Sequence, residues 1–182
     1  MALSESVSAL LRDYSIPLTR AEFRGSTEWR ALEKKGIDNL FPGARDAQAA
    51  WSGLLLLLGE WERSHEISQD NSSPEGSYWH AIAHRIEPDS SNAGYWFRRV
   101  GIHPIFADLH EKAATILATH DPNGWRLKAT WDPILFITWC EEARKGPGTP
   151  AERAALEIQQ AEWRLLFEWC ALNANDLRRR PK

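Results

Sequence analysis

The segment from Ala44 to Trp61 is apolar on almost every side of a helix and contains five consecutive leucines, Leu54 to Leu58. A helix that lacks a polar face has to be surrounded by other parts of the fold, so this segment predicts a buried central helix. Ser52 and Gly53 within it are small enough to let a second helix approach closely. The leucine run is far shorter than the roughly 20 apolar residues that cross a bilayer, so we expect no membrane span.

Periodic apolar residues, capping residues and helix-ending glycines and prolines predict further helices on both sides of this segment. The predicted ranges are Ser4–Tyr14, Ser26–Lys35, Ser77–Glu87, Asp89 or Ser90 to Val100, Pro104–His120, Thr130–Lys145 and Ala151–Asn175. No run of five or more residues alternates with the β-branched character of a strand. The sequence therefore predicts an all-α fold, with one globular domain over residues 1–182 built as a bundle of about seven helices.

The charge balance and the cysteines limit the partners and the compartment. The net charge is −3, so no overall basic field attracts nucleic acid or an anionic membrane. Cys140 and Cys170 lie in apolar helical segments without a CxxC pattern, which is typical of reduced, buried thiols. Because no signal segment is recognisable either, we expect a cytoplasmic protein that binds a small molecule rather than nucleic acid or membrane. The sequence does not determine the oligomeric state.

The predicted helix Ser77–Glu87 carries two histidines, His80 and His84, four residues apart. Residues at this spacing share one helix face, so both rings can reach one divalent metal ion, and Glu87 extends the same row. The pair resembles the histidines of a zinc-binding HExxH helix, but Ala81 stands where that motif has its general-base glutamate. Three roles therefore stay open: metal ligation, acid–base catalysis by one ring, and hydrogen bonding at the edge of the core.

The next predicted helix places Tyr95, Arg99 and Asn92 on one face, beside an apolar stripe that includes Trp96. An arginine between aromatic rings presents a fixed fork of donors to a carboxylate or phosphate, although a structural ion pair explains it equally well. Arg98 points away from this face, so Arg99 is the better candidate for a site residue.

Glu162 falls inside the apolar stripe of the last predicted helix. A buried carboxylate needs a partner, and the candidates are Arg85, Arg99 or one of the histidines. The polar residues of these helices together predict one site. Its predicted catalytic residues are His80, His84, Glu87 and Arg99, of which His80 and His84 are also the predicted metal ligands. Its predicted substrate-binding residues are His65, Gln69, Arg85, Asn92, Trp96, His103 and Glu162.

Two motifs occur in this part of the chain: WHxxxHRxExD from Trp79 to Asp89, and NxxYWFRxVGxHP from Asn92 to Pro104. They resemble a group of uncharacterised bacterial and fungal proteins that carry both motifs in this order. The resemblance covers about the middle quarter of the chain strongly and the ends loosely. It implies that these polar residues occur together as a block, and it supplies no reaction, cofactor or substrate.

These features favour a small-molecule enzyme of hydrolase or lyase type. In this hypothesis His80 or His84 acts as acid–base catalyst or metal ligand, and an arginine holds an anionic substrate in a pocket between the central and the last helix. A divalent metal is the one cofactor that the residues suggest, since no GxGxxG or GxxxxGK[ST] loop is present. Two alternatives remain: a non-catalytic module that binds an anionic or aromatic metabolite, and a structural protein with an internal polar network.

Overall fold

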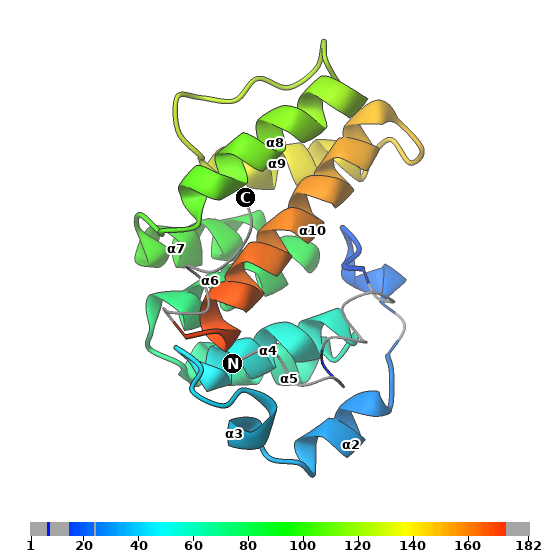
Figure 1. Ribbon diagram of the computed structural model, residues 1–182. Helices are drawn as coiled ribbons and strands as arrows, with labels where there is room; N and C mark the ends of the chain where they lie inside the picture. Colours follow the sequence, from blue (N-terminus) through cyan, green and yellow to red (C-terminus); the bar gives the residue numbers. More distant parts are fainter. Residues whose placement is uncertain (1–6, 8–14, 24, 174–182) are drawn as a thin grey trace.

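A computed structural model describes residue 7, residues 15–23 and residues 25–173 of the chain. This part contains nine α-helices, one short 3-10 helix and no β-strand, which confirms the all-α prediction (Figure 1). The predicted helix Ser4–Tyr14 lies outside the described residues, except for Val7, which is helical and buried. The elements are η1 (Arg20–Glu22), α2 (Glu28–Glu33), α3 (Ile37–Leu40), α4 (Ala47–Leu57), α5 (Trp61–Asp70), α6 (Pro74–Ile86), α7 (Ser90–Val100), α8 (Phe106–His120), α9 (Pro133–Ala143) and α10 (Pro150–Ala171).

α4 is the buried central helix that the sequence predicts. All residues from Ala49 to Leu57 are buried, and the helix packs against α5, α6 and α10. It is shorter than predicted at both ends. The Asp46 side chain caps its start by accepting a hydrogen bond from the Ala49 amide, and Gly59, with a left-handed φ of 81°, ends it. Trp61, predicted as the end of the central helix, is instead the first residue of α5.

α10 links the two parts of the hydrophobic core and crosses the front of the molecule in Figure 1. Near its start, Ala154 and Ile158 pack into a cluster with residues of α8 and α9. Near its end, Trp163 and Phe167 pack into a second cluster with residues of α4 and α6. One long helix therefore joins the α8–α9 layer to the α4–α6 layer.

Three consecutive helices, α5, α6 and α7, are joined by short connections at residues 71–73 and 87–89. Ser73 caps α6 and Asp89 caps α7, because each side chain accepts a hydrogen bond from a backbone amide of the first turn. α7 ends at Val100, before Gly101, as predicted. α6 packs against both α5 and α7, so the residues predicted to form the site lie on three helices in contact.

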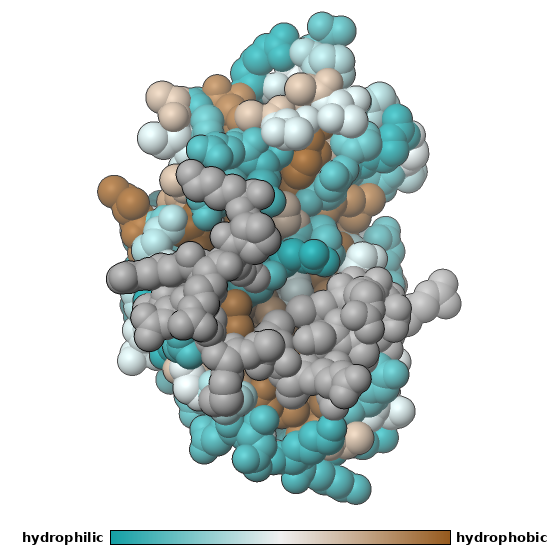
Figure 2. All heavy atoms as spheres, in the orientation of Figure 1, coloured by the Kyte–Doolittle hydropathy of each residue, from teal (hydrophilic) through white to brown (hydrophobic). Residues whose placement is uncertain are grey.

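Hydrophilic residues cover much of the surface in Figure 2, with hydrophobic residues visible between them. Hydrophobic atoms project at the left edge of this view, near the connection between α7 and α8, where Ile102 is 96% exposed. None of the described helices combines the length and the apolar character that a membrane span needs.

Candidate metal centre

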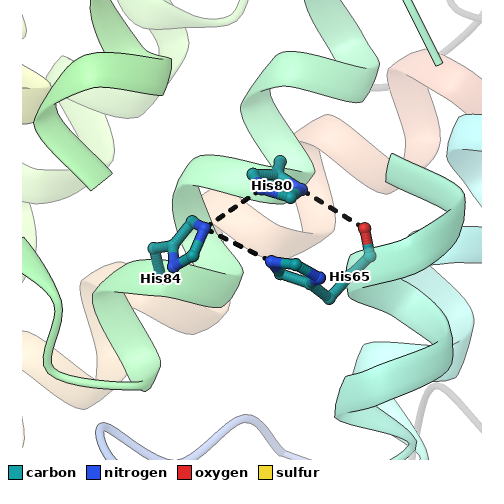
Figure 3. A group of neighbouring side chains, drawn as sticks. All are labelled: His65, His80 and His84. Atoms are coloured by element: carbon teal, nitrogen blue, oxygen red, sulfur yellow. Dashed lines mark hydrogen bonds between the residues drawn. The ribbon is translucent and has the colours of Figure 1, made fainter. Parts of the chain in front are cut away.

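Three histidine side chains from two neighbouring helices converge on one point (Figure 3). His65 comes from α5, and His80 and His84 come from α6. Nε2 of His84 lies 3.0 Å from Nε2 of His80 and 3.3 Å from Nε2 of His65. One ligand nitrogen from each ring lies within 4.8 Å of the other two. Since His80 and His84 are buried and His65 is half-buried, the cluster lies at the edge of the core.

Helix geometry and a pair of serines bring the three rings together. His80 and His84 project from one face of α6 because they are four residues apart. The Ser52 hydroxyl on α4 donates a hydrogen bond of 2.9 Å to the Ser64 carbonyl, which holds the start of α5 against the central helix. The next residue of α5 is His65, whose ring then meets the two rings of α6.

The hydrogen bonds of His80 determine which of its ring nitrogens carries the proton. Nδ1 lies 3.2 Å from the Ser68 hydroxyl and 3.3 Å from the backbone carbonyl of His65. The hydroxyl donates its own proton to that carbonyl, at 3.0 Å, so it accepts from His80. Because both partners of Nδ1 act as acceptors, Nδ1 carries the proton. Nε2 of His80 therefore presents a lone pair to the cluster.

Glu87 determines the tautomer of His84 in the same way. Nδ1 of His84 lies 3.2 Å from Oε2 of Glu87, and a carboxylate oxygen only accepts, so Nδ1 carries a proton. Arg20 donates to the other carboxylate oxygen at 3.2 Å and holds it in place. A carboxylate in this position is a common support for a histidine that binds metal through its other nitrogen. In the neutral ring, Nε2 of His84 also presents a lone pair.

Two lone pairs that face each other at 3.0 Å repel, so a cation between them, either a proton or a metal ion, stabilises the contact between His80 and His84. An added proton on Nε2 of His84 can be directed at one acceptor, whereas a metal ion accepts lone pairs from all three rings. Metal–nitrogen distances of about 2.0–2.1 Å and angles of about 90–110° separate the ligand nitrogens by about 2.8–3.4 Å. The two distances from His84, 3.0 and 3.3 Å, lie in this range, and all three ligand nitrogens lie within 4.8 Å of one another. Two of the three contacts therefore have the spacing of a metal site, and a small shift of the His65 or His80 ring would bring the third into range.

Burial keeps the rings of His80 and His65 in the form that binds metal. Desolvation, together with repulsion from His65 and His84, lowers the pKa of His80 to about 3. Burial and the neighbouring His84 also lower the pKa of His65. A metal-ligating histidine has to be neutral, so His80 and His65 have lone pairs available at pH 7.

Two tryptophans enclose the cluster. Trp61 of α5 stacks on His65, with ring centroids 4.7 Å apart and an interplanar angle of 20°. Its indole Nε1 donates to the Ala83 carbonyl at 2.9 Å, which anchors the ring on α6. Trp96 of α7 packs against His80 with ring centroids 4.2 Å apart. Such an apolar surround limits the access of water to the three nitrogens.

Arg85 and Glu162 form an ion pair in the core, between α6 and α10. Both side chains are fully buried, and neither hydrogen-bonds to the three histidines. The other carboxylate oxygen of Glu162 accepts a hydrogen bond of 2.9 Å from Tyr78. The guanidinium carbon of Arg85 lies 4.6 Å from the centre of the Phe136 ring. Arg85 is thus the partner that the buried carboxylate needs, and the pair lies apart from the histidine cluster.

His103 lies in a separate contact, with Glu75 at the start of α6. Its Nδ1 accepts a hydrogen bond from the Ile105 amide at 3.3 Å, and its Nε2 lies 3.6 Å from Oε1 of Glu75. The ring is buried and packs edge-on against Tyr78. The structure therefore does not bring His103 into the cluster.

Three further predicted residues, Gln69, Asn92 and Arg99, are exposed on α5 and α7. Asn92 donates to the Asp89 side chain at 3.2 Å, at the start of α7. Arg99 lies over the Trp96 ring, with its guanidinium carbon 5.0 Å from the ring centre. Because Trp96 also packs on His80, Arg99 lies beside the cluster.

The cluster lies between α5 and α6, not between the central and the last helix as the sequence suggested. The interface of α4 and α10 is filled by Trp163, which is buried and donates to the Gly53 carbonyl at 2.9 Å.

Three residues around the cluster are missing from the sequence prediction: Arg20, Trp61 and Ser68. Trp61 lies four residues before His65 and Ser68 three residues after it, a spacing that becomes informative once residues 61–70 are known to be a helix. No local signal identifies Arg20, because its partner Glu87 is 67 residues away.

Three imidazole ligands suit zinc, iron, nickel or copper and leave a coordination position for water or substrate. When bound at such a site, a metal ion lowers the pKa of its water ligand to about 7 and polarises a carbonyl or phosphoryl oxygen. No family model, no curated protein and no solved structure matches this chain, so its function has to be inferred from the geometry of the histidine cluster.

Proposed function

We propose that His65, His80 and His84 bind one divalent transition-metal ion, and that the protein is a metal-assisted enzyme of hydrolase or lyase type acting on a small molecule. The observation that carries the proposal is the convergence of three Nε2 atoms, two of which belong to rings whose Nδ1 proton is engaged elsewhere. A purely structural network pairs each acceptor with a donor. Here Nε2 of His80 and Nε2 of His84 face each other at 3.0 Å, a contact that a metal ion between them would satisfy together with His65.

The number and position of the ligands support catalysis rather than a structural metal. Structural zinc sites are closed by four protein ligands, whereas catalytic sites use three and keep one position open. Within the described part of the chain, three histidines make up the candidate ligand set. Because the His65 ring is half-buried, one side of the site is near solvent, where a small molecule can enter.

Ser68 and Glu87 are the positioning residues of this centre. They accept the Nδ1 protons of His80 and His84, which fixes the orientation of each ring and makes its Nε2 a better ligand. Arg20 binds the carboxylate of Glu87 and so acts on the centre through that side chain.

The metal content of the purified full-length chain tests the centre. After loading with Zn²⁺, Fe²⁺, Mn²⁺ or Co²⁺ and desalting, we expect one bound ion per wild-type chain and none in the His80→Gln, His84→Gln variant. A His110→Gln, His120→Gln variant is the matched control and should keep its metal, because these rings contact Lys128 and Glu157 instead. Circular dichroism shows whether each variant keeps the helical fold.

A second variant covers the case in which the buried double substitution prevents folding. His65→Gln removes one ligand from a half-buried position, where a polar side chain is tolerated. A folded wild type that takes up no metal at neutral pH, or a folded cluster variant that retains its metal, contradicts the proposed centre.

Turnover tests the enzymatic part of the proposal. Wild type is assayed for hydrolysis of esters, amides and phosphate esters and for elimination of water from hydroxy acids. We expect activity that a chelator removes and added metal restores. A protein that binds metal and small molecules but converts none of them is a binding module rather than an enzyme.

The two cysteines support a cytoplasmic location for this enzyme. Cys140 and Cys170 are both buried and free. Burial raises the pKa of Cys140 to about 11 and that of Cys170 well above its usual value, so both thiols stay protonated and unreactive. Free thiols are typical of reducing compartments. Fractionation of cells that contain the protein checks this location.

A further inference from the structure

Each tryptophan beside the histidine cluster carries an arginine over its ring. The guanidinium carbon of Arg20 lies 4.0 Å from the centre of the Trp61 ring, and Trp61 stacks on His65. Arginine, indole and imidazole thus follow one another on the α5 side of the cluster.

The same order occurs on the α7 side. Arg99 lies 5.0 Å from the centre of the Trp96 ring, and Trp96 lies 4.2 Å from the centre of the His80 ring. These two distances place the guanidinium carbon of Arg99 no more than about 9 Å from the His80 ring. A small molecule that spans the Trp96 ring would contact both the guanidinium and the metal centre, which is the arrangement that orients a bound substrate.

The two arginines differ in their charge partners. Arg20 forms ion pairs with Glu62 and Glu87, so its positive charge is already compensated. Arg99 has no carboxylate partner among the described residues, and its contacts there are the rings of Trp96 and Tyr95. Arg99 is thus an exposed cation beside the cluster, held against aromatic rings and free to bind an anion.

The neighbouring Arg98 provides a comparison on the same helix. It is also exposed, but its guanidinium nitrogens lie 3.7 and 3.8 Å from the position that a Cβ atom of Gly94 would occupy. Its side chain therefore runs back along α7 toward Gly94 and Ile134, away from the tryptophan and the histidines.

We propose that Arg99 binds the anionic group of the substrate, which is therefore a small carboxylate or phosphate that extends from Arg99 past the Trp96 ring to the metal centre. This inference rests on the metal-assisted enzyme proposed above. A guanidinium held against an indole presents a planar edge of N–H donors that matches the oxygens of a carboxylate or phosphate. Arg20 does not serve this role, because its donors bind Glu62 and Glu87.

The test compares anions that can contact both the Arg99 guanidinium and the metal centre with anions that can contact only one of them. The full-length chain is loaded with Co²⁺, whose visible absorption reports a carboxylate arriving at the metal, and is titrated with dicarboxylates and with monocarboxylates of the same length. We expect the best dicarboxylate to bind wild type about tenfold more tightly than its matched monocarboxylate. Arg99→Gln should abolish this preference, and Arg98→Gln should preserve it. Phosphonocarboxylates of the same lengths show whether a phosphate is bound better than the second carboxylate.

The outcomes separate this inference from the proposed metal centre. An Arg99→Gln variant that binds Co²⁺ and keeps the preference, or an Arg98→Gln variant that loses it, overturns the anion site and leaves the metal centre intact. If wild type binds no Co²⁺, the metal centre fails, and the same dicarboxylates are titrated into the metal-free chain by calorimetry. Binding that Arg99→Gln weakens then supports the anion site on its own. Binding that the substitution leaves unchanged, or no binding, overturns it.

Discussion

Nδ1 of His84 lies 3.2 Å from one carboxylate oxygen of Glu87, and Arg20 donates to the other oxygen. Glu87 therefore connects the segment before α2 to the histidine cluster. In Glu87→Gln an uncharged amide replaces the carboxylate, so the ring of His84 is held less firmly and its Nε2 becomes a weaker ligand. We expect the affinity for Zn²⁺ to fall by about 10–100-fold, measured by competition with a chelating dye.

Glu62→Gln is the matched control for this change. It removes the same charge and the other carboxylate partner of Arg20, and Glu62 hydrogen-bonds to none of the three histidines. Its affinity for Zn²⁺ should stay close to that of wild type. Equal losses in the two variants would mean that Glu87 acts through its charge alone and not through its hydrogen bond to His84.

The buried ion pair of Arg85 and Glu162 predicts a large effect on stability. Glu162→Gln leaves a charged guanidinium in the core without a counter-charge, which should lower the free energy of unfolding by about 3–5 kcal/mol. Glu157→Gln on the same helix removes a more exposed contact with His120 and should cost less than about 1 kcal/mol. Urea unfolding of the two variants measures both values. Losses of similar size would show that the buried ion pair contributes no more to the free energy of unfolding than the exposed contact does.

Close contact between α4 and α6 makes Gly53 sensitive to added volume, as its small size suggested. A Cβ atom at this position would lie 2.4 Å from the Trp79 ring, so Gly53→Ala should destabilise the fold by about 1–3 kcal/mol. Gly94→Ala is the comparison, because its nearest neighbours would lie at an ordinary 3.7 Å. Replacing a helical glycine by alanine there should stabilise by about 0.5–1 kcal/mol. Thermal unfolding should therefore give shifts of opposite sign.

Clear end signals explain which helices could be predicted from the sequence. α7 is bounded by the capping side chain of Asp89 and by Gly101, and its predicted ends agree with the structure. The apolar run of α4 contains no polar residue that marks its end, so the prediction continued through Gly59 into the first residue of α5. The rest of α5 is polar and has only a narrow apolar face, so its sequence pattern does not predict a helix.

Local sequence patterns also predict only part of the site. The spacing of His80 and His84 predicts that both rings can reach one ion, and their Nε2 atoms lie 3.0 Å apart. The convergence of His65 depends on how α5 packs against α6, which no local pattern encodes. Arg20 approaches the cluster from a segment far away in the sequence, so its role becomes visible only in three dimensions.

The low pKa of His80 makes the stability of the metal-free protein depend on pH. The folded ring has a pKa of about 3, against 6.5 for an unperturbed histidine, so the unfolded chain binds more protons between these values. The contribution of His80 is present above about pH 6.5 and is lost as pH falls toward 3, at up to about 1.4 kcal/mol per pH unit. Urea unfolding of chelator-treated protein between pH 7.5 and 4.5 should therefore show a steeper loss of stability in wild type than in His80→Gln. His120→Gln, which alters a more exposed ring, should keep the wild-type slope, and equal slopes in all three proteins would refute a neutral, buried His80.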